Sequence, residues 1–300
     1  MLKKASRPSL QENSCPVCGK NNVRKFWAMS GYRLVRCLNC GMVWDPFPPE
    51  NLESIYTENY FENENPKGGY ANYFEGMNIN KRTFYERIRR INKKVNSKGR
   101  MLDVGSALGD SLLEAKRLGW KDLYGVELSQ FAAGESRKRG LDIRTGTLVS
   151  AKYASDFFDI VTLQDVIEHV ADPSDEMKEI YRILKPGGFV FVVTPDIGGF
   201  WHKALGPLWY HYKPGEHIMY FSQATLARVL KDAGFDNIET RKTYHVMSLE
   251  YIFNRLRFYS PLFFGFLLKL TRRSFLGKLS FRVYAGEIEG WGQKGFQRVE

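Results

Sequence analysis

Strand-like and helix-like segments alternate through the middle of this 300-residue chain, between residues 100 and 240. Short apolar runs typical of strands occur at Arg100–Val104, Leu123–Glu127, near Asp142–Arg144, Phe158–Leu163 and Phe189–Thr194. Helical segments separate them at Asp110–Leu118, Gln130–Arg139, Asp175–Leu184 and Ser222–Ala233. The alternation predicts a doubly wound α/β fold, in which helices cover both faces of a mainly parallel sheet.

The composition supports a folded core and excludes several classes of protein. Hydrophobic residues make up 43% of the chain and charged residues 26%, which excludes a wholly disordered chain, a collagen-like repeat and a many-spanning membrane protein. The first 14 residues lack the apolar core of a signal peptide, so we expect a cytoplasmic protein. The net charge of +11 comes from two basic ends, which can attract nucleic acid, anionic lipid or a phosphorylated substrate, or form an ordinary solvated surface.

All four cysteines lie near the N-terminus, in two CxxC pairs: Cys15 with Cys18, and Cys37 with Cys40. A glycine follows each pair and lets the backbone turn sharply beneath a metal ion. Two such turns supply the four-sulfur set that zinc prefers, and because no position is left for water, the zinc would be structural. The alternatives are a redox CxxC and two disulfides. The doubled spacing favours a zinc ribbon over residues 1–45.

A glycine-rich turn follows the first strand of the alternating region, in the sequence MLDVGSALG. Such a turn lets backbone amides approach a cofactor at the start of a helix. Asp103 lies at the end of that strand, where its carboxylate would repel a pyrophosphate but attract the cationic groups of S-adenosylmethionine (SAM). Glu127 ends the next strand and can accept hydrogen bonds from both ribose hydroxyls. The alternative is that both are ordinary turn acids.

Residues 100–240 resemble the class I SAM-dependent methyltransferases. The matching stretches, in order along the chain, are LDVGSALGD, LYGVELS, FDIVTLQDVIEHV, LKPGGFVFVVTP and GEHIMYFSQATLARVLKDAGF. The resemblance implies a cofactor loop containing Asp103, Gly105 and Gly109, with Ala107 where the family often has glycine. It further implies that Glu127 holds the ribose and that Leu128 lies against adenine. It also implies that Thr147 and Leu148 line the adenine pocket and that Gln164 faces the methionine end of SAM.

The segment Glu216-His217-Ile-Met-Tyr220-Phe-Ser222 resembles the Glu-His-x-x-Tyr-Phe-Ser element of sugar C-methyltransferases, in which a zinc module also precedes the methyltransferase domain. The resemblance implies that His217 is the catalytic base, Glu216 its partner and Tyr220 a substrate contact. The alternative is a histidine that only holds the loop. Those enzymes usually carry a further large C-terminal domain, for which residues 241–300 are too few.

The remaining histidines carry weaker signals. His169 belongs to the family's Glu-His pair after the fourth strand, and we expect it to be structural. His202, His211 and His245 have no neighbours in the sequence that indicate a role.

A connector over residues 46–98 precedes the alternating region. Its second half has an apolar stripe with helical spacing, formed by Phe84, Ile88, Ile91 and Val95. The basic residues of this helix, which we expect to face water, are Arg82, Arg87, Arg89, Arg90, Lys93 and Lys94. The first half contains tyrosines that can close over a cofactor or simply pack, namely Tyr56, Tyr60, Tyr70 and Tyr73.

Residues 241–300 form an aromatic and basic extension. The uncharged run 258–268 is flanked by Arg255, Arg257, Lys269, Arg272 and Arg273. A membrane-spanning helix needs about 20 apolar residues, so this run is too short to cross a bilayer. It can instead attach the protein peripherally to a membrane surface, cover the substrate pocket as an apolar flap, or form a dimer contact.

These features predict a SAM-dependent methyltransferase domain over residues 99–240, with structural Zn²⁺ in the ribbon. We expect the acceptor to be a sugar or another small polar metabolite, which can be linked to a nucleotide or a lipid. The alternatives are an RNA methyltransferase, whose zinc module would hold RNA, and a non-catalytic SAM-binding scaffold. The sequence does not decide whether O, N or C is methylated, nor the oligomeric state.

Overall fold

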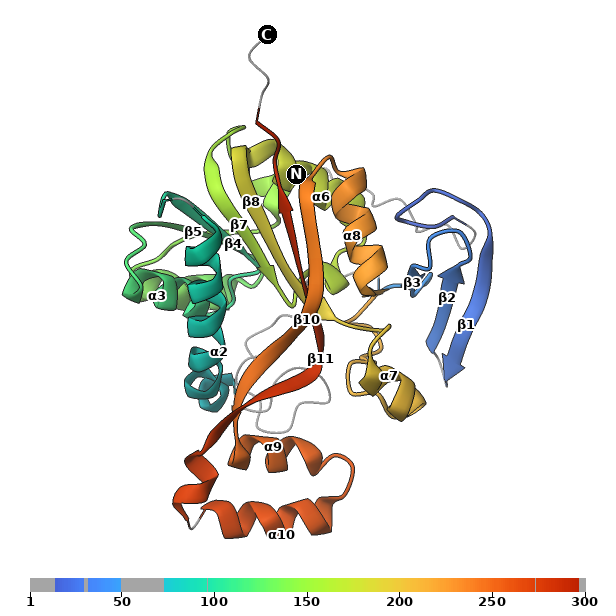
Figure 1. The fold of residues 1–300 in the computed structure, drawn as a ribbon, viewed down its shortest axis with the longest axis vertical. Coiled ribbons are helices and arrows are strands. Elements are labelled where there is room, and N and C mark those ends of the chain that lie inside the picture. Colours follow the sequence, from blue (N-terminus) through green and yellow to red (C-terminus); the bar gives the residue numbers. More distant parts are fainter. Residues whose placement is uncertain (1–13, 30–31, 50–72, 96, 273, 297–300) are drawn as a thin grey trace.

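The computed structural model describes residues 14–29, 32–49, 73–95, 97–272 and 274–296 (Figure 1). Its centre is a seven-stranded sheet with the strand order β10-β11-β8-β7-β4-β5-β6. The strands are β4 (Arg100–Val104), β5 (Asp122–Glu127), β6 (Asp142–Thr145), β7 (Phe158–Gln164), β8 (Leu184–Pro195), β10 (Asp236–Ser248) and β11 (Ser280–Gln293). Neighbours among β4 to β8 pair in parallel, whereas β11 pairs antiparallel with both β8 and β10. The predicted doubly wound, mainly parallel sheet is therefore confirmed.

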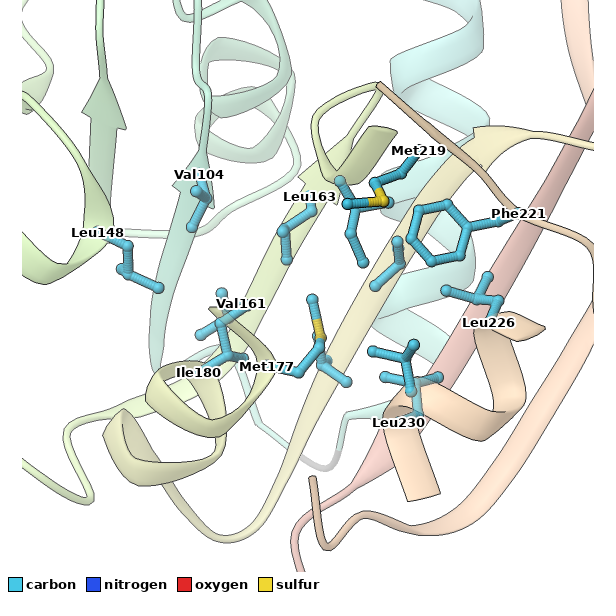
Figure 2. Close-up of a cluster of buried hydrophobic side chains, with 14 of the residues drawn as sticks. Val104, Leu148, Val161, Leu163, Met177, Ile180, Met219, Phe221, Leu226 and Leu230 are labelled. Carbon is cyan, nitrogen blue, oxygen red and sulfur yellow. The ribbon is translucent and has the colours of Figure 1, made fainter. Parts of the chain in front are cut away.

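Helices pack on both faces of this sheet. They are α2 (Tyr73–Lys94), α3 (Asp110–Arg117), α4 (Gln130–Lys138), α5 (Leu148–Ala151), α6 (Pro173–Ile183) and α8 (Gln223–Asp232). Side chains of α2, α3 and α4 share one buried cluster, and those of α5, α6 and α8 share another. Figure 2 shows the second cluster, in which Met177 of α6 lies near Val161 of β7, while Leu226 of α8 lies farther along the sheet, against Gly290 of β11. The sheet thus has a separate apolar core on each face.

Local sequence signals set most helix ends. The Ser222 side chain accepts a hydrogen bond from the Thr225 backbone N–H and caps α8, as expected, and Gly234 follows that helix with φ +100°. One boundary differs from the sequence prediction. Helix α6 ends at Ile183, and β8 already begins at Leu184, because Leu184 pairs with Phe158 before the Pro186–Gly188 turn is reached.

The N-terminal cysteine region forms a second, four-stranded sheet with the order β1-β2-β3-β9. Its strands are β1 (Val23–Met29), β2 (Tyr32–Cys37), β3 (Val43–Trp44) and β9 (Met219–Tyr220). Strand β9 comes from the segment between Pro195 and Ser222, far along the chain from β3. The ribbon is therefore joined by strand pairing to the segment that contains His217.

Residues 241–300 do not form a separate extension. The division expected after residue 240 falls inside β10, and β11 lies between β10 and β8 in the central sheet. Between these two strands the chain forms α9 (Leu249–Leu256), α10 (Pro261–Arg272) and the short 3-10 helix η4 (Phe275–Lys278). Figure 1 shows α9 and α10 as a hairpin at one end of the molecule, beyond the tips of β10 and β11.

The basic face expected on α2 is only partly in water. Ile88 and Ile91 are fully buried, as the apolar stripe predicts, but Arg87 is also buried and pairs with Glu287 of β11 at 3.1 Å. Arg90 pairs with Glu289 at 2.8 Å. The expectation was wrong for these two arginines because β11, absent from the predicted sheet, brings two carboxylates against the helix.

Candidate active site and metal centre

One large cavity, of about 820 Å³, lies at the carboxyl ends of the central strands. The turns after β4, β5 and β7 form one end of it. The other end is formed by α2, the segment 195–217 and the strands β10 and β11, with the α9–α10 hairpin beside them. Ligands of open α/β sheets bind at this edge because the loops there can vary while the strands stay fixed.

The glycine-rich turn forms a cradle at the first end. Gly105 has φ +68°, and a Cβ atom there would collide with Val166, so only glycine fits without rearrangement. Ala107 adopts φ +48°, a conformation that costs a non-glycine residue about 1–2 kcal/mol. Its backbone N–H donates to Glu127 Oε2 at 2.8 Å. Gly109 begins α3 with φ +80° but does not line the cavity, because its Cα faces Leu141 and Ser136.

Two buried carboxylates face this end of the cavity. Asp103 is 4% exposed and accepts a hydrogen bond from Thr162 Oγ1 at 2.5 Å. Burial raises its pKa to about 6. Glu127 accepts from the backbone N–H groups of Ala107 and Ser129, and burial raises its pKa as well. A cationic or hydroxyl-bearing ligand would stabilise both charges, since the contacts described around them come from neutral groups.

The other residues expected at a cofactor line the same end of the cavity. They are Leu128 after β5, Thr147 and Leu148 at the start of α5, and Gln164 at the end of β7. Gln164 donates to Ser111 Oγ at 2.8 Å and accepts from Arg87 at 3.2 Å, so its amide links the two ends of the cavity. Every expected cofactor residue except Gly109 therefore meets at one place.

A family model for a methyltransferase domain matches residues 77–240, more than half of the chain. This chain belongs to that family. It is a class I SAM-dependent methyltransferase. The ubiquinone/menaquinone biosynthesis C-methyltransferase of Geotalea daltonii is 28% identical over 172 residues, which cover 47% of this chain and 72% of that protein. A ubiquinone biosynthesis O-methyltransferase of Thiobacillus denitrificans is 28% identical over 184 residues, 55% of this chain and 77% of that protein.

Solved methyltransferase structures share the fold. A SAM-dependent methyltransferase from Archaeoglobus fulgidus superposes with a TM-score of 0.52 at 14% identity, over 74% of this chain and 99% of the other. A possible histamine N-methyltransferase from Thermotoga maritima superposes with a TM-score of 0.50 at 20% identity, over 74% and 92% of the two chains. At these identities the likeness concerns the fold alone.

Two histidines and a glutamate line the cavity of this methyltransferase beyond the cofactor end. Glu168 and His169 lie in the 3-10 helix η2 (Ile167–His169), and His217 comes from the loop before β9. Burial lowers the pKa of His169 to about 4 and that of His217 well below its usual range, so both rings are neutral at pH 7. Donor atoms of the three residues lie within 4.8 Å of one another. Such a cluster can accept a proton from a bound molecule, and it is also a donor set that can hold a divalent cation.

Glu216 and Tyr220 occupy other places than expected. The Glu216 carboxylate is buried outside the cavity, with one oxygen 3.8 Å from Lys213 Nζ. Its backbone carbonyl, rather than its side chain, lies 2.8 Å from His169 Nδ1. Tyr220 is 1% exposed and packs with Leu34 and Val43 of the ribbon sheet. The prediction that Tyr220 contacts the substrate is therefore wrong, because β9 directs the Tyr220 ring into the interface with the ribbon.

A buried ionic network, which sequence reasoning missed, lies at the end of the cavity opposite the glycine-rich turn. Glu287 of β11 lies 2.5 Å from His245 Nε2 of β10 and 3.1 Å from Arg87 of α2. Burial alone would raise the pKa of Glu287, but His245 and Arg87 outweigh it and hold the pKa at about 2. Asp165 lies 3.9 Å from the same arginine. These residues come from α2, β10, β11 and the turn after β7 and meet only in the folded protein, so no local motif could have revealed them.

The four cysteines form one cluster. The Sγ atoms of Cys15 and Cys40 are 3.5 Å apart, as are those of Cys18 and Cys37. These separations are far above the ~2.05 Å of a disulfide and near the ~3.8 Å expected between sulfurs that bind one tetrahedral zinc at 2.3 Å. Gly19 and Gly41 follow with positive φ, as the turn beneath a metal requires. The geometry fits a structural zinc ion.

Proposed function

We propose that this enzyme transfers a methyl group from SAM to a sugar or another small polar metabolite held between Asp103 and His217. The observation that carries the proposal is one continuous cavity whose two ends differ in chemistry: Asp103 and Glu127 face one end, and the neutral rings of His169 and His217 face the other. Its volume of about 820 Å³ is at the upper end of the usual range for small-molecule sites. Both molecules can therefore lie in the same enclosed space.

The first end of the cavity would hold SAM. Asp103 would attract the cationic methionine part, and Glu127 would accept hydrogen bonds from the ribose hydroxyls. Both Glu127 oxygens already accept one backbone N–H, and a carboxylate can accept further hydrogen bonds. Leu128, Thr147 and Leu148 would surround the adenine, and the cradle at Gly105 leaves room for close approach of the ligand. SAM itself supplies an electrophilic methyl carbon whose leaving group is a neutral thioether.

The second end would activate the acceptor. We assign His217 as the base that takes the acceptor's proton, because its ring is neutral, lines the cavity and lies edge-to-face against His169 at 4.8 Å. The Glu216 carbonyl would fix the neighbouring ring through His169 Nδ1. The chain's larger contribution is alignment of the two reactants away from water, which is worth roughly 7–11 kcal/mol.

The ribbon would hold the catalytic loop in place. The Asp45 backbone N–H donates to the Ile218 carbonyl at 2.8 Å, and the Ile218 N–H donates to the Glu168 carbonyl at 2.9 Å. The residue next to His217 is thus fixed from both sides, by the ribbon and by η2. Zinc bound to the four cysteines would stabilise this arrangement without touching the acceptor.

An apolar wall favours an acceptor that carries a lipid. Ile252, Leu256 and Phe264 of the α9–α10 hairpin line the acceptor end, whereas Arg255 and Lys213 supply positive charge there. A polar head with an acidic linker and an apolar tail would match both features, although a nucleotide linker would match the cations alone. RNA is a less favoured acceptor, because Arg87 and Arg90 on the basic face of α2 already form ion pairs with buried carboxylates.

The substitution His217→Ala tests the assignment. We expect turnover to fall about 10²- to 10⁴-fold, while the dissociation constant for SAM, measured by calorimetry, stays unchanged. His202→Ala is the matched control, since His202 contacts Tyr212 outside the cavity. Full turnover in His217→Ala would remove His217 as the base. A panel of sugars, lipid-linked sugars and RNA, assayed at several salt concentrations, would identify the acceptor.

A further inference from the structure

The α9–α10 hairpin has two different faces. It lies at the end of the molecule, carried by β10 and β11 (Figure 1). The two helices pack against each other through Phe253 and Phe264, whose ring centroids are 6.3 Å apart, and Leu268 is buried at 4% exposure. The inner face meets the rest of the protein: Tyr259 donates to the Leu208 carbonyl at 3.2 Å.

The outer face exposes large apolar side chains to solvent. Leu262, Phe266 and Leu270 of α10 are 90%, 61% and 53% exposed and follow one another at intervals of four residues, so they lie on one side of the helix. Phe258 and Phe263 beside them are 66% and 59% exposed. None of these five side chains lines the cavity. A contiguous apolar surface of this kind marks an interaction site.

Basic residues border this outer face. Residues 249–282 contain seven lysines and arginines but only one acidic residue, Glu250. Glu250 pairs with Arg272 at 2.9 Å, whereas Arg257 and Lys269 are exposed at the margin of the apolar side chains. Apolar side chains beside a ring of positive charge match the chemistry of an anionic lipid surface.

We propose that the outer face of α10 docks onto the surface of an anionic lipid bilayer, with Leu262, Phe266 and Leu270 inserted among the lipid headgroups. The helix lies in the surface instead of crossing it: among the described residues, no helix has the length and apolarity of a membrane span. The inner face of the same hairpin lines the cavity. A lipid-linked acceptor would therefore enter the cavity from the membrane side, and this step rests on the proposed function.

A bilayer explains the charge better than a second copy of the chain does. In a symmetric dimer through this face, the exposed Arg257 and Lys269 of each hairpin would face the same positive charges on its partner. Like charges across an interface oppose association. An anionic bilayer, by contrast, neutralises them, and each lysine or arginine near its surface adds to the attraction.

Flotation with lipid vesicles tests the docking without any methyl-transfer assay. We expect the full-length protein to bind vesicles containing phosphatidylglycerol roughly tenfold or more tightly than vesicles of phosphatidylcholine alone. High salt should weaken this binding. The double substitution Leu262→Glu, Phe266→Glu should lower binding to anionic vesicles at least about tenfold. Val149→Glu is the matched control, since Val149 is 64% exposed on α5, away from the hairpin, and should bind as the unchanged protein does.

Three results would overturn the proposal: equal binding to neutral and anionic vesicles, unchanged binding of the double variant, or a dimer that the double substitution dissociates. SAM affinity and thermal unfolding of the double variant should match the unchanged protein, because both side chains are exposed and outside the cavity. Loss of vesicle binding would leave methyl transfer to a soluble acceptor intact. A failed methyltransferase assay would likewise leave the vesicle result standing.

Discussion

The two ends of the cavity are built in different ways. The cofactor end consists of turns that directly follow β4, β5 and β7, and its carboxylates bond to nearby hydroxyls and amides. The acceptor end joins residues far apart in the sequence, such as Arg87 and Glu287, which are 200 positions apart. The charges differ as well. Asp103 at the cofactor end has a raised pKa, whereas Glu287 is stabilised by its own cationic partners.

This difference indicates what each end can bind. Buried carboxylates that lack a protein cation are stabilised when a cationic ligand arrives, so the cofactor end is complementary to SAM. At the acceptor end Glu287 is already paired with Arg87 and His245, so we expect specificity there to depend on shape and on the neutral histidines. Substitutions at the two ends should therefore affect different measurements.

The most extensive change is expected from removal of the zinc that we propose supports the acceptor end. The purified protein should contain one zinc per chain, and Cys37→Ser should lose it, because three thiolates hold zinc far less tightly than four. Turnover should fall at least about tenfold, since β9 loses its partner strand. SAM affinity should persist. Metal analysis with calorimetry checks both points, and retained turnover in the zinc-free variant would separate the ribbon from catalysis.

Breaking the ionic network should also damage the acceptor end. Arg87→Met leaves Glu287 buried with one partner fewer, and we expect the free energy of unfolding to fall by about 3–5 kcal/mol. Chemical denaturation measures this. Arg89→Met is the control, because Arg89 is exposed on the same helix. A similar stability for both variants would show that Arg87 adds nothing to the joint between α2 and β11.

At the cofactor end, Glu127→Ala should weaken SAM binding about 10- to 100-fold through loss of charged hydrogen bonds to the ribose. Calorimetry measures the dissociation constant. Glu135→Ala, in the solvent-facing pair with Lys138 on α4, is the control. Unchanged affinity in Glu127→Ala would contradict the ribose assignment.

The smallest effect is a pH dependence confined to the cofactor end. The pKa of Asp103 is about 6, against 3.8 ordinarily, so lowering the pH from 7 to 5 protonates it and removes its attraction for SAM. We expect the SAM dissociation constant to rise about tenfold over this range. In the absence of SAM, the effect of pH on folding stability has the opposite sign to its effect on SAM binding. The folded state holds this proton more tightly than the unfolded chain, so this group's contribution to stability falls as the pH rises from 4 to 6. Asp103→Asn should remove both dependences, and an unchanged profile would contradict the role of Asp103.

The sequence alone determined the parts of this protein that depend on neighbouring residues. The alternation of strands and helices, the CxxC turns and the glycine-rich turn each act over fewer than ten residues, so their geometry follows from local backbone chemistry. The positions of Asp103, Gly105 and Glu127 at the cavity could therefore be predicted from the residues, and those of Leu128, Thr147, Leu148 and Gln164 from the family resemblance, whereas Gly109 does not line the cavity. The acceptor end could not be predicted, because Arg87, His245 and Glu287 meet only where α2 packs on the paired strands β10 and β11.

Tertiary structure also decided which side chains around His217 face the cavity. Glu216 and Tyr220 flank His217 in the sequence, yet the pairing of β9 with β3 turns Tyr220 into the ribbon interface, and the Glu216 carboxylate is buried near Lys213. Similarly, the sequence left three roles open for an apolar run with basic flanks: a pocket flap, a dimer contact and a surface anchor. In the folded hairpin one face lines the cavity and the opposite face is exposed, because a helix presents its opposite sides to different surroundings.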